Sequence, residues 1–402
     1  MNTAILVVIS LAVVLALIRL KVPNGIAMAA GGIVVILASG MGLGGILRTV
    51  GTTLGSAQTQ SVLATMLLVI VLEQLMTNFG LTDRLVASLG RLIPDKRVHM
   101  VLLPAFMGLL PSAGGALLSC PMVDRASDGS EASPEKKAFA NFWFRHIMEF
   151  IAPVYTAIII LAQITKLPMA SLLRAMLPMA LVATAVGIPV AFRGTRKPAP
   201  RPSDGDGKKR DALRGLVLSV LPLAAVLIMV ITFGLSPIVA LIPVILALIA
   251  IYRPKPPDYR KMAANVFNPA MIGMIIGLMF YKDALTGSGG IEALGSTFSG
   301  FGLSMPLLAL LLPFAVGFLT GMSSVTMALV MPILISMYGI EAITPQLAAL
   351  SYTGCNMGMN LTPTHLCLVL TVDYFKVDLI KVIGLLLLPA MAVMAAALLI
   401  LA

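Results

Sequence analysis

Residues 102–122 read LLPAFMGLLPSAGGALLSCPM, an apolar segment interrupted at its centre by Pro-Ser-Ala-Gly-Gly, residues 111–115. A helix that simply crosses a membrane has no use for this interruption, whereas a hairpin that enters the bilayer and leaves on the same side needs one. Backbone freed from a helix at membrane depth is tolerated only where it is buried in protein or lines a cavity. The segment therefore predicts a re-entrant hairpin over about residues 98–123, with a binding site at its tip.

The second half of the chain contains a counterpart. Residues 311–333 read LLPFAVGFLTGMSSVTMALVMPI, with Thr-Gly-Met-Ser-Ser, residues 320–324, at the centre. Two interrupted apolar segments at corresponding places in two halves are the best sequence indication of a transporter's binding site. We therefore expect a second re-entrant hairpin over about residues 303–337.

The composition is that of an all-α polytopic membrane protein. The chain has 402 residues, of which 59% are hydrophobic and only 11% charged, and its mean hydropathy is +1.01. Soluble domains carry about 25% charged residues. Apolar runs of about 20 residues, long enough to cross the hydrocarbon of a bilayer, recur along the chain. We expect membrane lipid around the protein and no nucleic-acid partner.

Ten full spans are predicted besides the two hairpins. Two of them, the fourth and the ninth, are expected to be broken near Pro153 and Pro363. The expected spans are 3–18, 26–41, 61–79, 134–163, 172–192, 216–233, 238–252, 268–284, 345–372 and 382–401.

The two halves match when one is shifted along the other. A shift of 209 residues pairs Thr77 with Thr286, Gly80 with Gly289, Asp83 with Glu292, Leu85 with Leu294, Pro104 with Pro313 and Gly108 with Gly317. A shift of 210 pairs Pro153 with Pro363 and Lys166 with Lys376. We therefore predict an internal duplication with a first repeat at 1–193, a disordered linker at 194–212 and a second repeat at 213–402.

Each predicted repeat has five spans and one hairpin, so the repeats must have opposite orientations in the membrane. The charges fit one such topology, because 23 of the 28 Lys and Arg then lie in or beside cytoplasmic loops, as the positive-inside rule requires. That topology places both termini outside and the linker in the cytoplasm. The first hairpin enters from the cytoplasm and the second from outside.

This architecture resembles the ion transporter superfamily, which includes divalent anion/sodium symporters, citrate and gluconate permeases and relatives of arsenite permeases. Through LLPSAGGALLSCPMVD (109–124) and NLTPTHLCL (360–368), the chain looks closest to an uncharacterised prokaryotic integral membrane family of unknown function within it. The resemblance implies a homodimer with an elevator mechanism, in the inner membrane of a prokaryotic cell. Spans 1–3 and 6–8 would form the dimerising scaffold, while the hairpins and spans 4, 5, 9 and 10 move. The Ser-Asn-Thr tips of the symporters are absent here, which leaves the coupling ion and the substrate open.

Candidate substrate-binding residues lie at the hairpin tips, in span 4 and in span 9. A helix that restarts at a tip presents free N–H groups and a positive dipole end, which favour an anion. The alternative for the tips is Gly/Ser packing between ordinary spans. The candidates are Ser112, Ala113, Gly114, Gly115, Arg145, His146, Thr320, Gly321, Ser323, Ser324, Asn360, Thr362, Thr364 and His365.

Candidate residues for a coupling ion are drawn from the same segments. Asn141, Arg145 and Glu149 are spaced i, i+4, i+8 and are expected on one helical face. Ionisable residues within a span usually mark a substrate or ion path, although a structural Arg–Glu pair, or a Pro kink satisfied by local hydroxyls in span 9, would also fit. The ion-site candidates are Ser112, Asn141, Glu149, Ser323, Asn356 and Asn360.

The sequence favours a secondary active transporter of a small organic anion, of the carboxylate class, coupled to sodium or protons. A passive anion channel and an inorganic oxyanion permease are the alternatives. An enzyme is not expected, because the chain has neither HExxH nor GxSxG, and its three His lie in different elements. Cys120, Cys355 and Cys367 form no CxxC pair, so neither disulfides nor zinc are indicated. We expect no cofactor and no metal other than sodium.

Overall fold

The computed structural model describes residues 6, 9–10, 12–14, 16–17, 20, 22–93, 95–109, 115–196, 206–253, 263, 266–290, 303–363 and 365–402. Every regular element within these ranges is a helix. The helices are α2 (Asn24–Ala38), α3 (Gly42–Gly55), α4 (Ala57–Asn78), α5 (Leu81–Leu92), α6 (Lys96–Gly108), α7 (Gly115–Ala126), α8 (Pro134–His146), η1 (Ile147–Phe150), α9 (Thr156–Thr165), α10 (Met169–Phe192), α11 (Asp206–Phe233), α12 (Pro237–Tyr252), α14 (Pro269–Gly287), α16 (Met305–Thr320), α17 (Ser323–Tyr338), η2 (Ile340–Ala342), α18 (Pro345–Leu361), α19 (Leu366–Phe375) and α20 (Leu379–Leu401). The expected first span, 3–18, lies mostly outside the described residues.

Several of these helices are long and apolar enough to cross a membrane. In the described part of the chain these are α4, α10, α11 from Lys209 onward, and α20. Shorter apolar helices such as α12, α16 and α17 accompany them. The protein is therefore an all-helical, multi-pass membrane protein.

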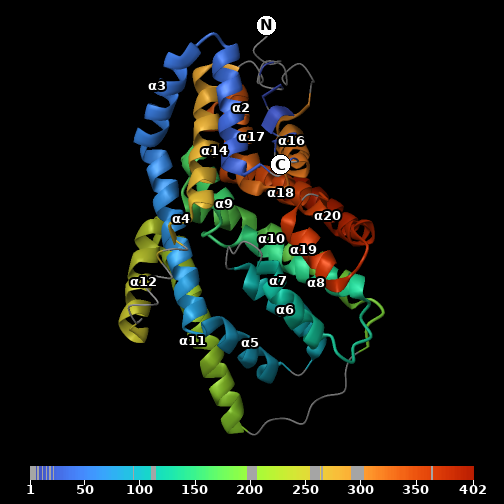
Figure 1. Ribbon diagram of the computed structural model, residues 1–402. Coiled ribbons are helices and arrows are strands. Elements are labelled where there is room, and N and C mark those ends of the chain that lie inside the picture. Colours follow the sequence, from blue (N-terminus) through green and yellow to red (C-terminus); the bar gives the residue numbers. More distant parts are fainter. Residues whose placement is uncertain are drawn as a thin grey trace.

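One group of helices, which we call the frame, comprises α2, α3, α4, α5, α11, α12 and α14. Within it α2 packs on α14, α4 on α12 and α5 on α11. The backbones of α2 and α14 are in direct contact at two glycines. A Cβ added to Gly277 would lie only 2.1 Å from the carbonyl oxygen of Gly25, so no larger residue fits there. In Figure 1, α3, α4, α11 and α12 run along one side of the molecule, at the left.

The second group, which we call the block, comprises α6 to α10 and α16 to α20. The helices α6 and α7 pack on each other, as do α16 and α17, so both expected hairpins form helix pairs. The packing crosses between the halves of the chain, with α7 against α19 and α17 against α9. In Figure 1, α6, α7, α8, α18, α19 and α20 of the block lie to the right of α3, α4, α11 and α12.

Two helices of the block are broken where the sequence predicts it. The α8 helix passes into η1, and residues 151–155 then separate it from α9. Residues 362–365 likewise separate α18 from α19. Ser133 caps α8 by accepting a hydrogen bond from the Lys136 backbone N–H at 3.4 Å, as its position before Pro134 indicates.

The helices that follow the two breaks have matching bounds. The α9 helix and the α19 helix are each 10 residues long and begin 210 positions apart. Both end at a lysine in the left-handed region, Lys166 with φ 57° and Lys376 with φ 52°. Positive φ is uncommon for residues other than glycine. The same two lysines are paired by the sequence shift of 210.

The expected linker is shorter than predicted. Helix α11 begins at Asp206, so residues 206–212 are helical rather than disordered, while residues 197–205 lie outside the described residues. Once the apolar segment after Leu213 is helical, each preceding residue that joins the helix adds one hydrogen bond and needs no new nucleation step. Lys and Arg are also good helix formers, which explains why this polar stretch extends the helix.

Candidate substrate and ion site

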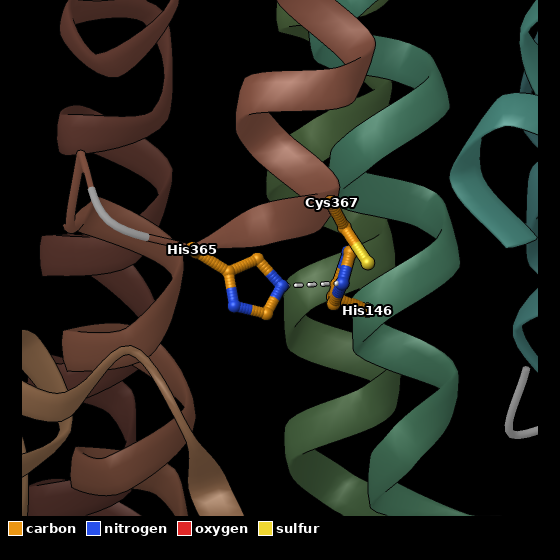
Figure 2. Close-up of side chains that lie close together, drawn as sticks. All are labelled: His146, His365 and Cys367. Atoms are coloured by element: carbon orange, nitrogen blue, oxygen red, sulfur yellow. Dashed lines mark hydrogen bonds between the residues drawn. The ribbon is translucent and has the colours of Figure 1, made fainter. Parts of the chain in front are cut away.

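The polar centre of the block is a contact between two histidines from opposite halves of the chain. His146 ends α8 and His365 caps α19, and their Nε2 atoms are 3.0 Å apart. Figure 2 shows His365 reaching from the second helix break to His146, with the Cys367 thiol beside it. The ligand atoms of these three residues all lie within 4.8 Å of one another. His146 is 3% exposed, whereas His365 and Cys367 are half-buried.

Both rings are also tied to backbone carbonyls through their second nitrogen. His146 Nδ1 is 2.7 Å from Phe142 O, one turn earlier in α8. His365 Nδ1 is 2.9 Å from Gly321 O, at the tip of the second helix pair. The α8 helix, the second helix break and the α16–α17 tip therefore meet at this point. The structure thus brings together three of the predicted substrate-binding residues, His146, Gly321 and His365, and their role in binding stays a prediction.

Glu149 forms a second polar contact beside the first. Its Oε2 accepts a hydrogen bond from Tyr352 Oη at 3.2 Å and lies 3.5 Å from Asn356 Nδ2, both on α18. Glu149 is only 5% exposed. A carboxylate this deeply buried needs hydrogen-bond donors around it, and α18 supplies them.

The expected single face of Asn141, Arg145 and Glu149 is wrong. The α-helix ends at His146 and Glu149 lies on the 3-10 turn η1, whose tighter winding of three residues per turn turns the side chain toward α18. Asn141 points elsewhere, because its Nδ2 donates to Cys120 Sγ at 3.1 Å and to Thr371 Oγ1 at 3.2 Å.

Arg145 anchors the end of the first helix pair. Its Nη1 donates to Met107 O at 2.8 Å, and Tyr155 Oη donates to Gly108 O at 2.5 Å. The side chain of Arg145 is buried and acts electrostatically on both Glu149 and Glu73. The positive side chain of Arg145 is therefore held at the end of α6 that leads to the first hairpin tip.

Two asparagines of α18 continue the polar contacts that begin at Glu149. Asn360 Nδ2 donates to Asn356 Oδ1 at 2.9 Å, and both residues are fully buried. Asn360 Oδ1 has no hydrogen-bond partner among the described residues. Buried acceptors without a partner are rare in folded proteins, so this oxygen is a candidate ligand for a cation.

The tip between α16 and α17 is stabilised by hydrogen bonds among its own residues. Thr320 Oγ1 lies 3.1 Å from Thr326 Oγ1, Gly321 has φ 66°, and α17 starts at Ser323 without a side-chain cap. Ser324 is buried beside it. The predicted tip residues thus adjoin the His365 contact, although the Thr320 hydroxyl is already used within the hairpin.

The remaining predicted residues fall partly outside the described part of the chain. This applies to Ser112, Ala113, Gly114 and Thr364. Gly115 begins α7, and Thr362 is 1% exposed at the second break.

Sequence reasoning missed one residue that bears directly on the site. Tyr352 donates to Glu149 across 203 positions of sequence. A signal was present, because Tyr352, Asn356 and Asn360 are spaced i, i+4, i+8 on α18, which puts them on one helical face.

Comparison with known proteins gives a fold neighbour and a family. The crystal structure of the YdaH transporter from Alcanivorax borkumensis, described as having an unusual topology, is similar with a TM-score of 0.62 and 17% sequence identity, over 88% of this chain and 86% of that one. No curated protein matches the sequence. The family model described as "Protein of unknown function (DUF401)" matches residues 2–402. The chain belongs to this family.

Proposed function

We propose that the protein is a secondary active transporter of a small organic anion of the carboxylate class, coupled to sodium or protons, and not an enzyme. One observation carries the proposal. The two broken helices bring His146, Glu149, Asn356 and His365 together inside the block. Polar and ionisable groups inside a membrane protein are costly and usually mark a substrate or ion path.

The arrangement of the repeats supports the same function. The paired bounds of α9 and α19 and the crossed packing of α7 on α19 and α17 on α9 are what an inverted repeat would produce. In transporters built this way, substrate and ions bind between broken helices near the middle of the bilayer. The similar fold belongs to a transporter. We propose the inner membrane of a prokaryote as the location, with both termini outside.

The division into frame and block suggests how the site could open to each side of the membrane in turn. Two cavities lie between the frame and the block. One, of about 430 Å³, is lined by α4, α9 and the α11–α12 turn, and the other, of about 100 Å³, by α11 and residues 151–154. Neither cavity is lined by the two histidines. We propose that a homodimer is held by its frames and that each block slides.

A passive channel or an inorganic oxyanion permease is the alternative. A channel needs a continuous polar lining, whereas Glu149, Asn356 and Asn360 are buried inside the block. An oxyanion could use the same positive groups, so substrate class has to be measured.

A thermal-shift screen followed by transport assays tests the proposal. Purified protein would be screened against carboxylates, sugar acids and inorganic oxyanions, and stabilising anions would be assayed as labelled solutes in proteoliposomes. We expect saturable uptake that responds to an imposed sodium or proton gradient. Uptake that never saturates and ignores both gradients would indicate a channel, and stabilisation by oxyanions alone would indicate the permease.

A further inference from the structure

We propose that the His146–His365 pair holds one excess proton between its Nε2 atoms, and that this proton is the coupling ion of the proposed transporter. The coupling claim rests on the proposed function, whereas the claim that the pair binds a proton stands on its geometry alone. The pair would then be a proton-carrying site at the contact between α8 and the second hairpin tip.

The proton count follows from the partners of the two Nδ1 atoms. Phe142 O and Gly321 O are backbone carbonyls, which can only accept hydrogen bonds. Each Nδ1 therefore carries a hydrogen and donates, at 2.7 Å for His146 and 2.9 Å for His365.

Two neutral rings cannot also bond to each other in this arrangement. A neutral imidazole has one N–H, so with both Nδ1 atoms protonated each Nε2 has only a lone pair. These lone pairs face each other at 3.0 Å, an ordinary hydrogen-bond distance. One additional proton turns this repulsive contact into a charge-assisted hydrogen bond, which is among the stronger kinds.

A metal ion fits the distance less well. Ring nitrogens bound to tetrahedral zinc lie about 2.0–2.1 Å from the ion, which separates two of them by about 3.3 Å at the tetrahedral angle. The observed 3.0 Å is shorter. A proton fits between the nitrogens without any movement of the rings.

The charges around the pair set the net charge that an approaching anion meets. The titratable groups in contact with the pair or in the polar contacts beside it are Arg145, Glu149, Cys367, Tyr352, Tyr155 and Cys120. Arg145 acts electrostatically on both rings, where its positive charge opposes protonation, and also on Glu149. With Glu149 ionised, the charges of Arg145 and Glu149 cancel, and the shared proton leaves the group with one net positive charge. An anion then approaches a positive site rather than a neutral one.

The hydrogen bond between His365 and Gly321 O links proton binding to movement of the α16–α17 tip. Gly321 O fixes the tautomer of His365. When the tip moves away, His365 can shift its hydrogen from Nδ1 to Nε2 and donate to His146 without any excess proton. Departure of the tip therefore allows release of one proton, which is the link that coupled transport needs.

Nitrogen NMR can count the protons directly. The chain has three histidines, so ¹⁵N-histidine labelling in lipid nanodiscs, with His99→Gln to remove the third, isolates the pair. We expect two protonated Nδ1 signals and two Nε2 signals that share one proton at neutral pH. A spectrum with one unprotonated Nδ1 would overturn the proposal, as would one equivalent of bound zinc or copper by elemental analysis.

Coupling is tested separately in proteoliposomes, with labelled citrate as the probe and a pH-sensitive dye inside. We expect an inward proton gradient to drive citrate uptake without sodium and with proton entry. In His146→Gln and His365→Gln any remaining uptake should ignore the gradient, whereas His99→Gln should respond as the wild type does. Uptake driven by sodium alone would refute the coupling claim. A wild type that moves no anion under either gradient would count against the transport proposal and the coupling claim together, and the NMR count would still decide the proton.

Discussion

Arg145→Ala is expected to weaken anion binding by roughly tenfold to a hundredfold, because a charge-assisted hydrogen bond contributes about 1.5–3 kcal/mol. Arg145 is 3% exposed and acts on Glu149 and on both histidines. Its loss leaves a buried carboxylate without its nearby positive charge. The measurement is the dissociation constant of the best anion from the screen, by calorimetry in detergent.

Lys282→Ala is the matched control for this change. Lys282 lies in the frame, where its Nζ donates to Gln58 Oε1 at 2.6 Å and pairs with Asp283 at 3.0 Å. Its removal takes away one positive charge far from the polar centre, so binding should change little. Equally small effects from both variants would mean that Arg145 serves only to hold the Met107 carbonyl.

Locking the block to the frame is expected to abolish uptake while leaving binding intact. Gln163 Nε2 on α9 donates to Ser61 Oγ on α4 at 3.2 Å, across the boundary between the two groups. Cysteines at these two positions, in a background without Cys120, Cys355 and Cys367, can be joined by a short bifunctional reagent. The proposed sliding requires this contact to break.

A crosslink within the frame controls for the chemistry. Thr53 Oγ1 donates to Asp283 Oδ2 at 2.7 Å, between α3 and α14. A crosslink at this pair should leave uptake unchanged because both helices belong to the frame. If the α4–α9 crosslink forms fully and transport continues at the wild-type rate, the block does not slide against the frame there.

The features of the site that could be predicted are those that short stretches of sequence determine. The helix breaks near Pro153 and Pro363 follow from proline in an apolar run, and Ser133-Pro134 marks a helix start. The pairing of Lys166 with Lys376 was visible as a sequence shift, and both adopt the same left-handed conformation. Each of these features depends on a few neighbouring residues.

The parts that could not be predicted depend on which helices meet. The His146–His365 contact joins residues 219 positions apart. The sequence around each of the two histidines does not show that they meet in the fold. The spacing of Asn141, Arg145 and Glu149 predicts one face only for a regular helix, whereas the chain tightens into η1 at Glu149. The composition of residues 206–212 predicts a disordered linker, because composition alone does not show that an adjacent apolar helix extends through it.

We propose that the polar centre is reached alternately from the two sides of the membrane. Thr362 lies at the second break and is 1% exposed. A single cysteine there, Thr362→Cys in the background without native cysteines, can be treated with a membrane-impermeant maleimide from either side of sealed vesicles. We expect labelling from both sides of the vesicles. Labelling from neither side in folded protein, or from one side only, would contradict the account.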